Sequence, residues 1–262
     1  MRKFFFAILM LVAGAAGAAE LREKFDKTYE TRPGSALSLT NVNGRITIKA
    51  WDQPRIQVHA EKYVDGFDSD VAKRAMAALQ IDVKQTGTGL AIETRQPKSG
   101  DGGGLFDWLT GNHVNAGVTY ELTIPRSMNL AVENTNGSIH VAEVGGKLDV
   151  GTTNGRIEVT RCSGSVNAET TNGAIRVELV QVTPGAAMRF ETTNGGITLS
   201  VPSTISASVD AGTTNGSVSS DVPITTNSYG KHSLRGTMNG GGPSIRLNTT
   251  NGSIRIQSAA SK

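Results

Sequence analysis

A cysteine pair and a long apolar run are both missing from this sequence, and each absence excludes a class of protein. A single cysteine, Cys162, cannot form an intramolecular disulfide, so the chain is not a disulfide-stapled exported domain. The apolar run Phe4–Val12 has only nine residues, whereas a helix needs about 20 to span a bilayer. We therefore expect no transmembrane segment in the mature chain. We also expect Cys162 to be a packed small side chain rather than a reactive thiol.

The first residues have the order of a secretory signal peptide. Arg2 and Lys3 provide a positive start, the apolar run Phe4–Val12 follows, and small residues then lead to a cleavage site after Ala18 or Ala19. No cysteine stands directly after the cleavage site, which excludes lipidation there. The sequence therefore predicts a signal peptide over residues 1–18 and an exported protein, periplasmic or cell-surface/secreted.

The charge balance gives no sign of a nucleic-acid partner. The whole chain has 26 basic and 23 acidic residues, and removing Arg2 and Lys3 with the signal leaves 24 basic residues against 23 acidic ones. A protein that binds DNA or RNA needs a concentrated basic patch, and the mature chain is close to neutral.

Glycine, by contrast, is abundant at 31 of 262 residues, and much of it lies in a repeated Asn-Gly pair. Most copies follow a threonine and are followed one or two residues later by an isoleucine or valine. From residue 136 they recur at steps of 18, 18, 22, 21, 24 and 12 residues, a period of about 20 that is typical of a solenoid or a similar array. The pairs are Asn43-Gly44, Asn136-Gly137, Asn154-Gly155, Asn172-Gly173, Asn194-Gly195, Asn215-Gly216, Asn239-Gly240 and Asn251-Gly252.

Between these pairs, apolar and polar residues alternate with a period of two. Leu148 and Val150 before one Asn-Gly pair, and Ile157 and Val159 after it, are separated by polar residues or glycine. This pattern predicts short strands with one buried face. The Asn-Gly pairs are predicted to be structural turns at positive φ, which glycine adopts freely and asparagine tolerates.

Two architectures fit these strands, an antiparallel meander of Asn-Gly hairpins and a solenoid of stacked coils. A meander needs an element to cover its apolar face, and no helical pattern occurs after residue 130. We therefore favour an all-β, elongated β-solenoid or β-helix-like array, with Thr and Asn side chains aligned in hydrogen-bonded ladders. Terminal coils would stack on one neighbour only, so changes at Asn172 or Gly173 should destabilise more than changes at Asn251 or Gly252.

The N-terminal third is less regular. Strands are predicted over residues 36–39, 46–50, 56–61, 81–85, 90–94 and 118–124, and one short helix over Val71–Leu79. The expected organisation is a signal peptide (1–18), an N-terminal β part with the helix and a Gly-rich loop, continuous with the array (19–130), and the repetitive β-array (131–258).

Several of these segments resemble a known family. They are the segment Leu39–Ile48, the pair Trp51-Asp52, the strand with Lys62, the short helix, the segment Tyr120–Arg126 and the Thr-Asn-Gly coils. Together they resemble the bacterial β-strand-repeat "putative adhesin" domain family of unknown function, which is adhesin-head-like. The resemblance covers nearly all of the mature chain and implies one elongated β-helix-like domain that is exported or surface-associated. The loop over residues 98–116 is longer and more apolar than the family leads us to expect.

No arrangement of residues predicts catalysis, a cofactor or a metal site. The four histidines (His59, His113, His140 and His232) have no metal-ligand spacing, and the glycines 102–104 lack the strand and lysine of a phosphate loop. A polysaccharide-acting β-helix enzyme is the alternative, since such enzymes gather carboxylates on one sheet. The corresponding outward column here mixes His140, Glu158, Arg176, Thr198, Ser219 and Arg255, which is typical of a solvated face.

The leading hypothesis is a non-enzymatic, adhesin-like interaction scaffold that presents a polar β face to a glycan or an envelope protein. A second possibility is that the polar residues serve only solubility and ladder formation. The third is a self-assembling structural protein that associates through its terminal coil, Ser253–Gln257, because an uncapped edge pairs with another chain.

One apolar cluster has two interpretations. Leu105, Phe106, Trp108 and Leu109 lie between Gly-rich flanks, and tryptophan is enriched where binding energy concentrates. The cluster is therefore a candidate partner contact. Alternatively, it folds back as a cap on the open end of the array, because an exposed cluster of this kind would promote aggregation.

Overall fold

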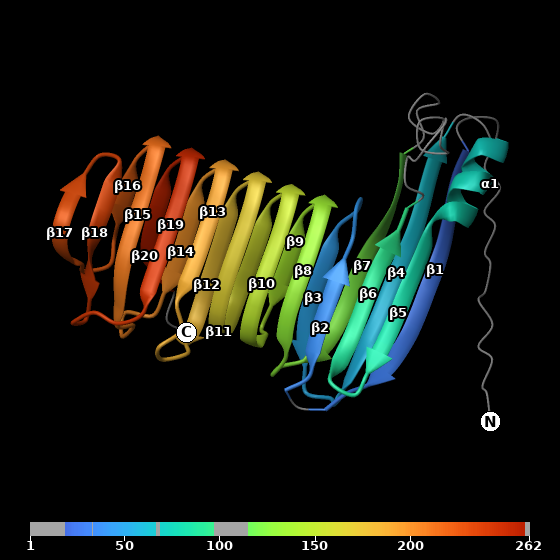
Figure 1. Ribbon diagram of the computed structural model, residues 1–262, viewed down its shortest axis with the longest axis horizontal. Helices are drawn as coiled ribbons and strands as arrows, with labels where there is room; N and C mark the ends of the chain where they lie inside the picture. The colour runs from blue at the N-terminus through green and yellow to red at the C-terminus, as the bar shows by residue number, and fades with distance from the viewer. Residues whose placement is uncertain (1–18, 33, 67–68, 97–114, 260–262) are drawn as a thin grey trace.

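The structure of the chain is a computed structural model that describes residues 19–32, 34–66, 69–96 and 115–259. Figure 1 shows these residues as one elongated row of strands with the helix α1 (Ser69–Ala78) at one end. The strand pairings form two ladders, A and B, which are joined through β11 (Ile157–Asn172). The first half of β11 pairs in ladder A and its second half in ladder B.

The strands follow one another in space in an order that differs from their order in the sequence. Ladder A runs β1 (Ala19–Glu30), β4 (Arg55–Gly66), β7 (Asn115–Pro125), β3 (Ile46–Trp51), β9 (Ile139–Ala142), β11, β12 (Ile175–Val182), β14 (Ile197–Val201), β20 (Ile254–Ser258) and β16 (Val218–Ser220). Ladder B runs β5 (Gln80–Thr86), β6 (Gly89–Arg95), β2 (Ala36–Thr40), β8 (Asn129–Asn136), β10 (Gly145–Asn154), β11, β13 (Met188–Asn194), β19 (Ser244–Asn251), β15 (Ala207–Asn215), β18 (Ser233–Met238) and β17 (Thr225–Gly230).

The predicted all-β class with one helix is confirmed for the described residues. Neighbouring strands in the middle of both ladders are parallel and in register, for example Leu148 beside Leu130 and Ile157 beside Ile139. Stacked coils produce parallel neighbours, whereas hairpins would place consecutive strands antiparallel, so the meander is excluded here. The six predicted N-terminal strands are present as β2 to β7, and the helix begins two residues before the predicted start. Strand β1 was not predicted.

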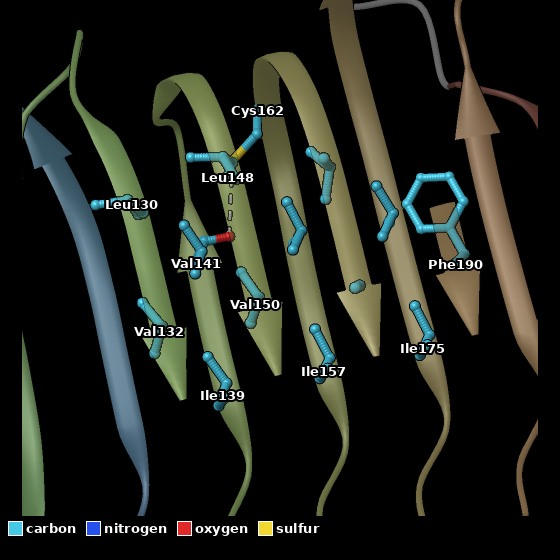
Figure 2. Packing of buried hydrophobic residues seen from close by; sticks show 14 of the residues in the cluster. Leu130, Val132, Ile139, Val141, Leu148, Val150, Ile157, Cys162, Ile175 and Phe190 are labelled. Carbon is cyan, nitrogen blue, oxygen red and sulfur yellow. Dashed lines mark hydrogen bonds between the residues drawn. The ribbon is translucent and has the colours of Figure 1, made fainter. Parts of the chain in front are cut away.

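The core lies between the two ladders and consists of rows of similar aliphatic side chains. Figure 2 shows the row Ile139, Ile157 and Ile175, in which each isoleucine lies beside its equivalent in the next coil. All three side chains are at most 1% exposed. Because each coil buries its apolar face against the opposite ladder and its neighbours, the array needs no covering helix.

The last coil of the sequence is an interior coil of the fold. Strand β19 pairs with β13 on one side and β15 on the other, and β20 pairs with β14 and β16. Figure 1 accordingly shows β19 between β13 and β15, and the C-terminus lies within the row rather than at its end. The prediction that Ser253–Gln257 forms an exposed edge was therefore wrong. Strands β15 and β16 therefore lie one coil beyond the position that directly follows β13 and β14. The chain passes through the β17–β18 hairpin, and β19 and β20 then occupy the position between.

The Asn-Gly turns are explained by close packing of coils rather than by positive φ. Among the seven pairs that stack, only Gly44 and Gly137 have positive φ, and no asparagine of these pairs does. A Cβ atom added to Gly173 would instead lie 1.8 Å from the carbonyl oxygen of Gly155 in the coil below. The prediction of positive φ was wrong for the other stacked pairs. It holds for Asn239-Gly240, at φ values of 47° and 83°, which forms the turn before β19 and no coil.

Cys162 is a packed side chain, as predicted. It is fully buried, and Figure 2 shows its Sγ atom pointing toward the carbonyl oxygen of Val141, 3.8 Å away. Burial raises the pKa of the thiol to about 11, so it is protonated at neutral pH.

We expect Cys162→Ser to fold normally and to lower the free energy of unfolding by about 1 kcal/mol, because the hydroxyl is smaller and more polar in an apolar site. A urea melt with circular dichroism measures this. Cys162→Ala serves as the matched control without a polar group. A disulfide-linked dimer of the wild-type chain on non-reducing gels would contradict the buried placement.

Candidate functional site

A ladder of asparagine side chains runs along one edge of the array. The Nδ2 atom of each asparagine donates to the Oδ1 atom of the next at 2.7–2.9 Å, always in the same direction. The ladder ends where Asn43 donates to the carbonyl oxygen of Ala116 at 3.1 Å. In spatial order the members are Asn215, Asn251, Asn194, Asn172, Asn154, Asn136 and Asn43.

A second row of hydrogen bonds is formed by the threonine that lies two positions before five of these asparagines; Asn134 and Asn41 take this place before Asn136 and Asn43. The hydroxyl of Thr170, for example, donates to the carbonyl oxygen of Gly155 in the neighbouring coil at 3.1 Å. Thr152, Thr192, Thr249 and Thr213 make the equivalent bond at 2.8–3.3 Å. The side chains of these asparagines and threonines are bonded to neighbouring coils. Among the described residues, the threonine that directly precedes the asparagine in each of these five coils is not, so its hydroxyl is available to a ligand.

Those intervening threonines line a trough on the outward face of ladder B. The trough consists of two adjoining hollows, of about 450 and 650 Å³, which share Glu169, Thr171 and Glu191. Neighbouring strands place the threonine hydroxyls in one row at a spacing of about 4.8 Å. The row comprises Thr153, Thr171, Thr193, Thr250 and Thr214, which are all exposed, and none of them has a hydrogen-bond partner among the described residues.

Carboxylates form a second row in the trough, beside the threonines. Glu133 and Glu169 lie on either side of Gly151, whose missing side chain leaves room that the Glu133 carboxylate occupies. Neither side-chain carboxylate has a hydrogen bond or an ion pair within the described part of the chain. Glu191, by contrast, is bound by Arg189 and Asn248. Two carboxylates without partners give this part of the trough a local negative charge.

The pKa values in the trough reflect this charge. Burial raises the pKa of Glu133, and the neighbouring charges of Glu169 and Asp149 raise it further. Burial also raises the pKa of Asp149, but hydrogen bonds from Lys147 and Asn167 outweigh it and leave the value below its usual range. The trough therefore favours a cationic or hydrogen-bond-donating group near Glu133 and Glu169.

The outward face of ladder A carries the column considered as an enzymatic alternative. In space it runs His140, Glu158, Arg176, Thr198, Arg255 and Ser219. Glu158 lies 3.7 Å from His140 and 4.0 Å from Arg176, so its charge is shared between two partly exposed bases. This is an ion-paired, solvated column, which agrees with the interpretation drawn from the sequence.

The other residues that the sequence analysis singled out and that the structure describes lie away from the trough, except His232. His59 is hydrogen-bonded to Asp26, and His232 lines the larger hollow near its end. The cluster Leu105, Phe106, Trp108 and Leu109, together with His113, lies outside the described residues, as does the predicted signal peptide. Within the described ranges no group of three or more metal-ligating side chains occurs, and no helix is long and apolar enough to cross a membrane.

The row of threonines could have been found from the sequence, because each precedes an Asn-Gly pair. The carboxylate row was missed, since Glu133, Glu169 and Glu191 lie at unequal steps along the chain and become neighbours only through the pairing of β8, β10, β11 and β13.

A protein-family model identifies the family of this chain. The model described as Toastrack DUF4097 matches residues 121–257, from the second half of β7 into β20. The chain belongs to the Toastrack DUF4097 family. The predicted membership of an adhesin-like family of unknown function is therefore confirmed. The trough lies within the matched part of this DUF4097 chain, and none of the curated proteins compared with it matches.

Two solved structures align with most of this DUF4097 chain. One is a "putative cell adhesion protein" from Clostridium sporogenes, with 12% identity, a TM-score of 0.47, and 90% of this chain and 99% of that chain covered. The other is a "putative adhesin" from Bacteroides fragilis, with 13% identity, a TM-score of 0.43, and 90% of this chain and 97% of that chain covered.

Proposed function

We propose that this chain is an exported, non-enzymatic adhesin-like protein of the cell envelope whose trough binds an extended polysaccharide. The observation that carries the proposal is the row of five exposed threonine hydroxyls beside Glu133 and Glu169, none of them with a partner in the described residues. A rigid row of donors and acceptors at a regular spacing suits a linear polymer that presents hydroxyl groups repeatedly along its length.

The charge in the trough narrows the class of polysaccharide. Glu133 and Glu169 attract an amine and repel a carboxylate, because they are two neighbouring acidic side chains to which no basic side chain in the described residues is bound. A neutral or amine-bearing polymer is therefore favoured over one rich in uronic acids. The trough also lies on strands that are paired on both sides rather than on a loop, so binding should cost little ordering of the protein.

A variant that removes hydroxyls without changing shape tests this function. We expect Thr171→Val with Thr193→Val to keep the fold and to weaken binding of chitosan oligosaccharides about tenfold or more, since each lost hydrogen bond costs about 1 kcal/mol. Isothermal titration calorimetry with chitosan, neutral glucan and alginate oligosaccharides measures the affinity and the preference for the amine.

The matched control is Thr47→Val with Thr198→Val, which makes the same change on the outward face of ladder A. This control is expected to bind as the wild type does. The proposal is abandoned if the wild type binds neither chitosan nor a neutral glucan, or if both double variants bind equally well.

A further inference from the structure

The strand β1 ends ladder A with a long unpaired edge. It has 12 residues and pairs only with β4 among the described strands. The backbone N–H and C=O groups on its other side are therefore open to a further strand, and such an edge is a template for pairing with another chain. The strand at the opposite end of ladder A, β16, has only three residues and so has far fewer unpaired backbone groups.

The charges along β1 are complementary to the same sequence read backwards. If two copies pair antiparallel with Phe25 opposite itself, Lys24 faces Asp26 of the other copy and Glu23 faces Lys27. Each of these pairs occurs twice because of the two-fold symmetry. Opposite charges in directly facing positions of an antiparallel pair stabilise it, and like charges destabilise it.

Other registers lose this complementarity. A shift by an odd number of residues would place the core-facing side of one β1 beside the outward side of the other. Shifting the centre by one residue, to Lys24 or Asp26, places that charged residue opposite itself. Centres at Leu21 and Tyr29 also avoid like-charge pairs, but they lie near the ends of β1 and would pair only residues 19–23 or 28–30, whereas the centre at Phe25 pairs residues 20–30. In the register centred on Phe25, the only facing residues of like charge are Glu20 of one copy and Glu30 of the other, at the ends of the paired segment. Glu20 is bound by Arg22 at 2.8 Å.

Within one chain, the lysines Lys24 and Lys27 of β1 have no acidic partner among the described residues, whereas Glu23 and Asp26 do have partners. Asp26 is hydrogen-bonded to Nδ1 of His59, and Glu23 lies 2.9 Å from Lys62. Lys24 has no ion pair in the described part of the chain. Lys27 contacts the ring of Phe25, 4.9 Å from its centroid, and no carboxylate there binds it. A second copy would bring an acidic side chain to each of these lysines.

We propose that two copies of this chain pair antiparallel through β1, with the two-fold axis at Phe25, and join their A ladders into one continuous sheet. The partner is a second copy because the charge pattern fits itself. The dimer buries the end of the array farthest from β17 and leaves the trough on ladder B accessible.

The core-facing side of β1 supports the same arrangement. Phe25 and Tyr29 are only partly buried although they pack against the main core. Tyr29 also lines a hollow of about 360 Å³ between the end of β1 and the β5–β6 hairpin. Helix α1 covers Leu21 at the other end of β1, and the two-fold axis places Leu21 of the second copy opposite Tyr29. The second copy's helix therefore approaches the uncovered side of Tyr29.

Disulfide trapping tests the register directly. Directly facing residues have Cα atoms about 4.5–5.5 Å apart, within the range that a disulfide spans. Phe25→Cys in the full-length chain is therefore expected to give a cross-linked dimer in nearly quantitative yield under mild oxidation, and the buried Cys162 does not compete. Thr28→Cys is the matched control, because its symmetry mate lies about 20 Å away along the strand. Equal cross-linking of both variants, or none with Phe25→Cys, overturns the proposal.

Charge reversal tests the pairing without a cross-link. In sedimentation equilibrium at low salt we expect the wild type to be a dimer, and Lys24→Glu to weaken dimerisation at least tenfold. The double variant Lys24→Glu with Asp26→Lys should restore the dimer, since the facing charges are again opposite. Ser228→Glu on β17, the edge at the other end, is the control and should leave the dimer intact. A monomeric wild type, or a double variant no better than Lys24→Glu, contradicts the proposal.

Discussion

A chain that ends at Pro243 is expected to lose its cooperative fold, although the deletion removes only the last coil in the sequence. The deleted strands β19 and β20 each pair with strands on both sides. They also contribute Ile245, Leu247, Ile254 and Ile256, all fully buried. Burying an aliphatic side chain contributes about 1.5–3 kcal/mol, so the four together account for roughly 6–12 kcal/mol. That equals a large part of the roughly 5–15 kcal/mol by which a typical protein is stable.

The measurement is a urea melt followed by circular dichroism, with limited proteolysis as a second probe. A chain that ends at Ala259 is the control, because it removes only the last three residues and keeps the backbone bond from Ala259 to Val201. The control should melt as the full-length chain does. A cooperative melt of the Pro243 chain at a urea midpoint near that of the full-length chain would show that the last coil does not lie inside the array.

Gly252→Ala is expected to destabilise the protein as strongly as Gly173→Ala, by about 3 kcal/mol or more in each case. A Cβ atom at Gly252 would lie 2.0 Å from the carbonyl oxygen of Gly195, and one at Gly173 would lie 1.8 Å from that of Gly155. Both obstacles are backbone atoms held by parallel strands, so they cannot move aside cheaply. This corrects the sequence-based expectation that Gly252, as part of a terminal coil, would tolerate change better.

The control for these two variants is Gly87→Ala in the β5–β6 hairpin. Nothing lies within 4 Å of the added atom there, and the backbone is outside the positive-φ region. We expect a change of about 0.5 kcal/mol or less. Chemical denaturation of the three variants provides the comparison. A mild effect at Gly252 together with a severe one at Gly173 would support a terminal position for the last coil.

The strands and the helix were well predicted because they depend on residues that are close together in the sequence. Alternation at Leu148 and Val150, or at Ile157 and Val159, depends only on which face of a strand is buried, and these side chains are buried as expected. The N-terminal strands and the helix were found for the same reason. Strand β1 was missed because its residues alternate weakly: Phe25 and Tyr29 lie among charged residues, as in a strand at the end of a sheet.

The sequence by itself determined that the fold is all-β and repetitive, because alternation and the Thr-Asn-Gly repeat specify strands and turns residue by residue. Only the tertiary structure decided the order of the coils, since the Asn-Gly coils resemble one another in sequence and β19 lies between β13 and β15 rather than after β15. Packing also decided why glycine follows each asparagine: the close approach of Gly173 to Gly155 joins residues 18 positions apart. The carboxylate pair Glu133 and Glu169 arises in the same way, from strands that become neighbours only when the coils stack.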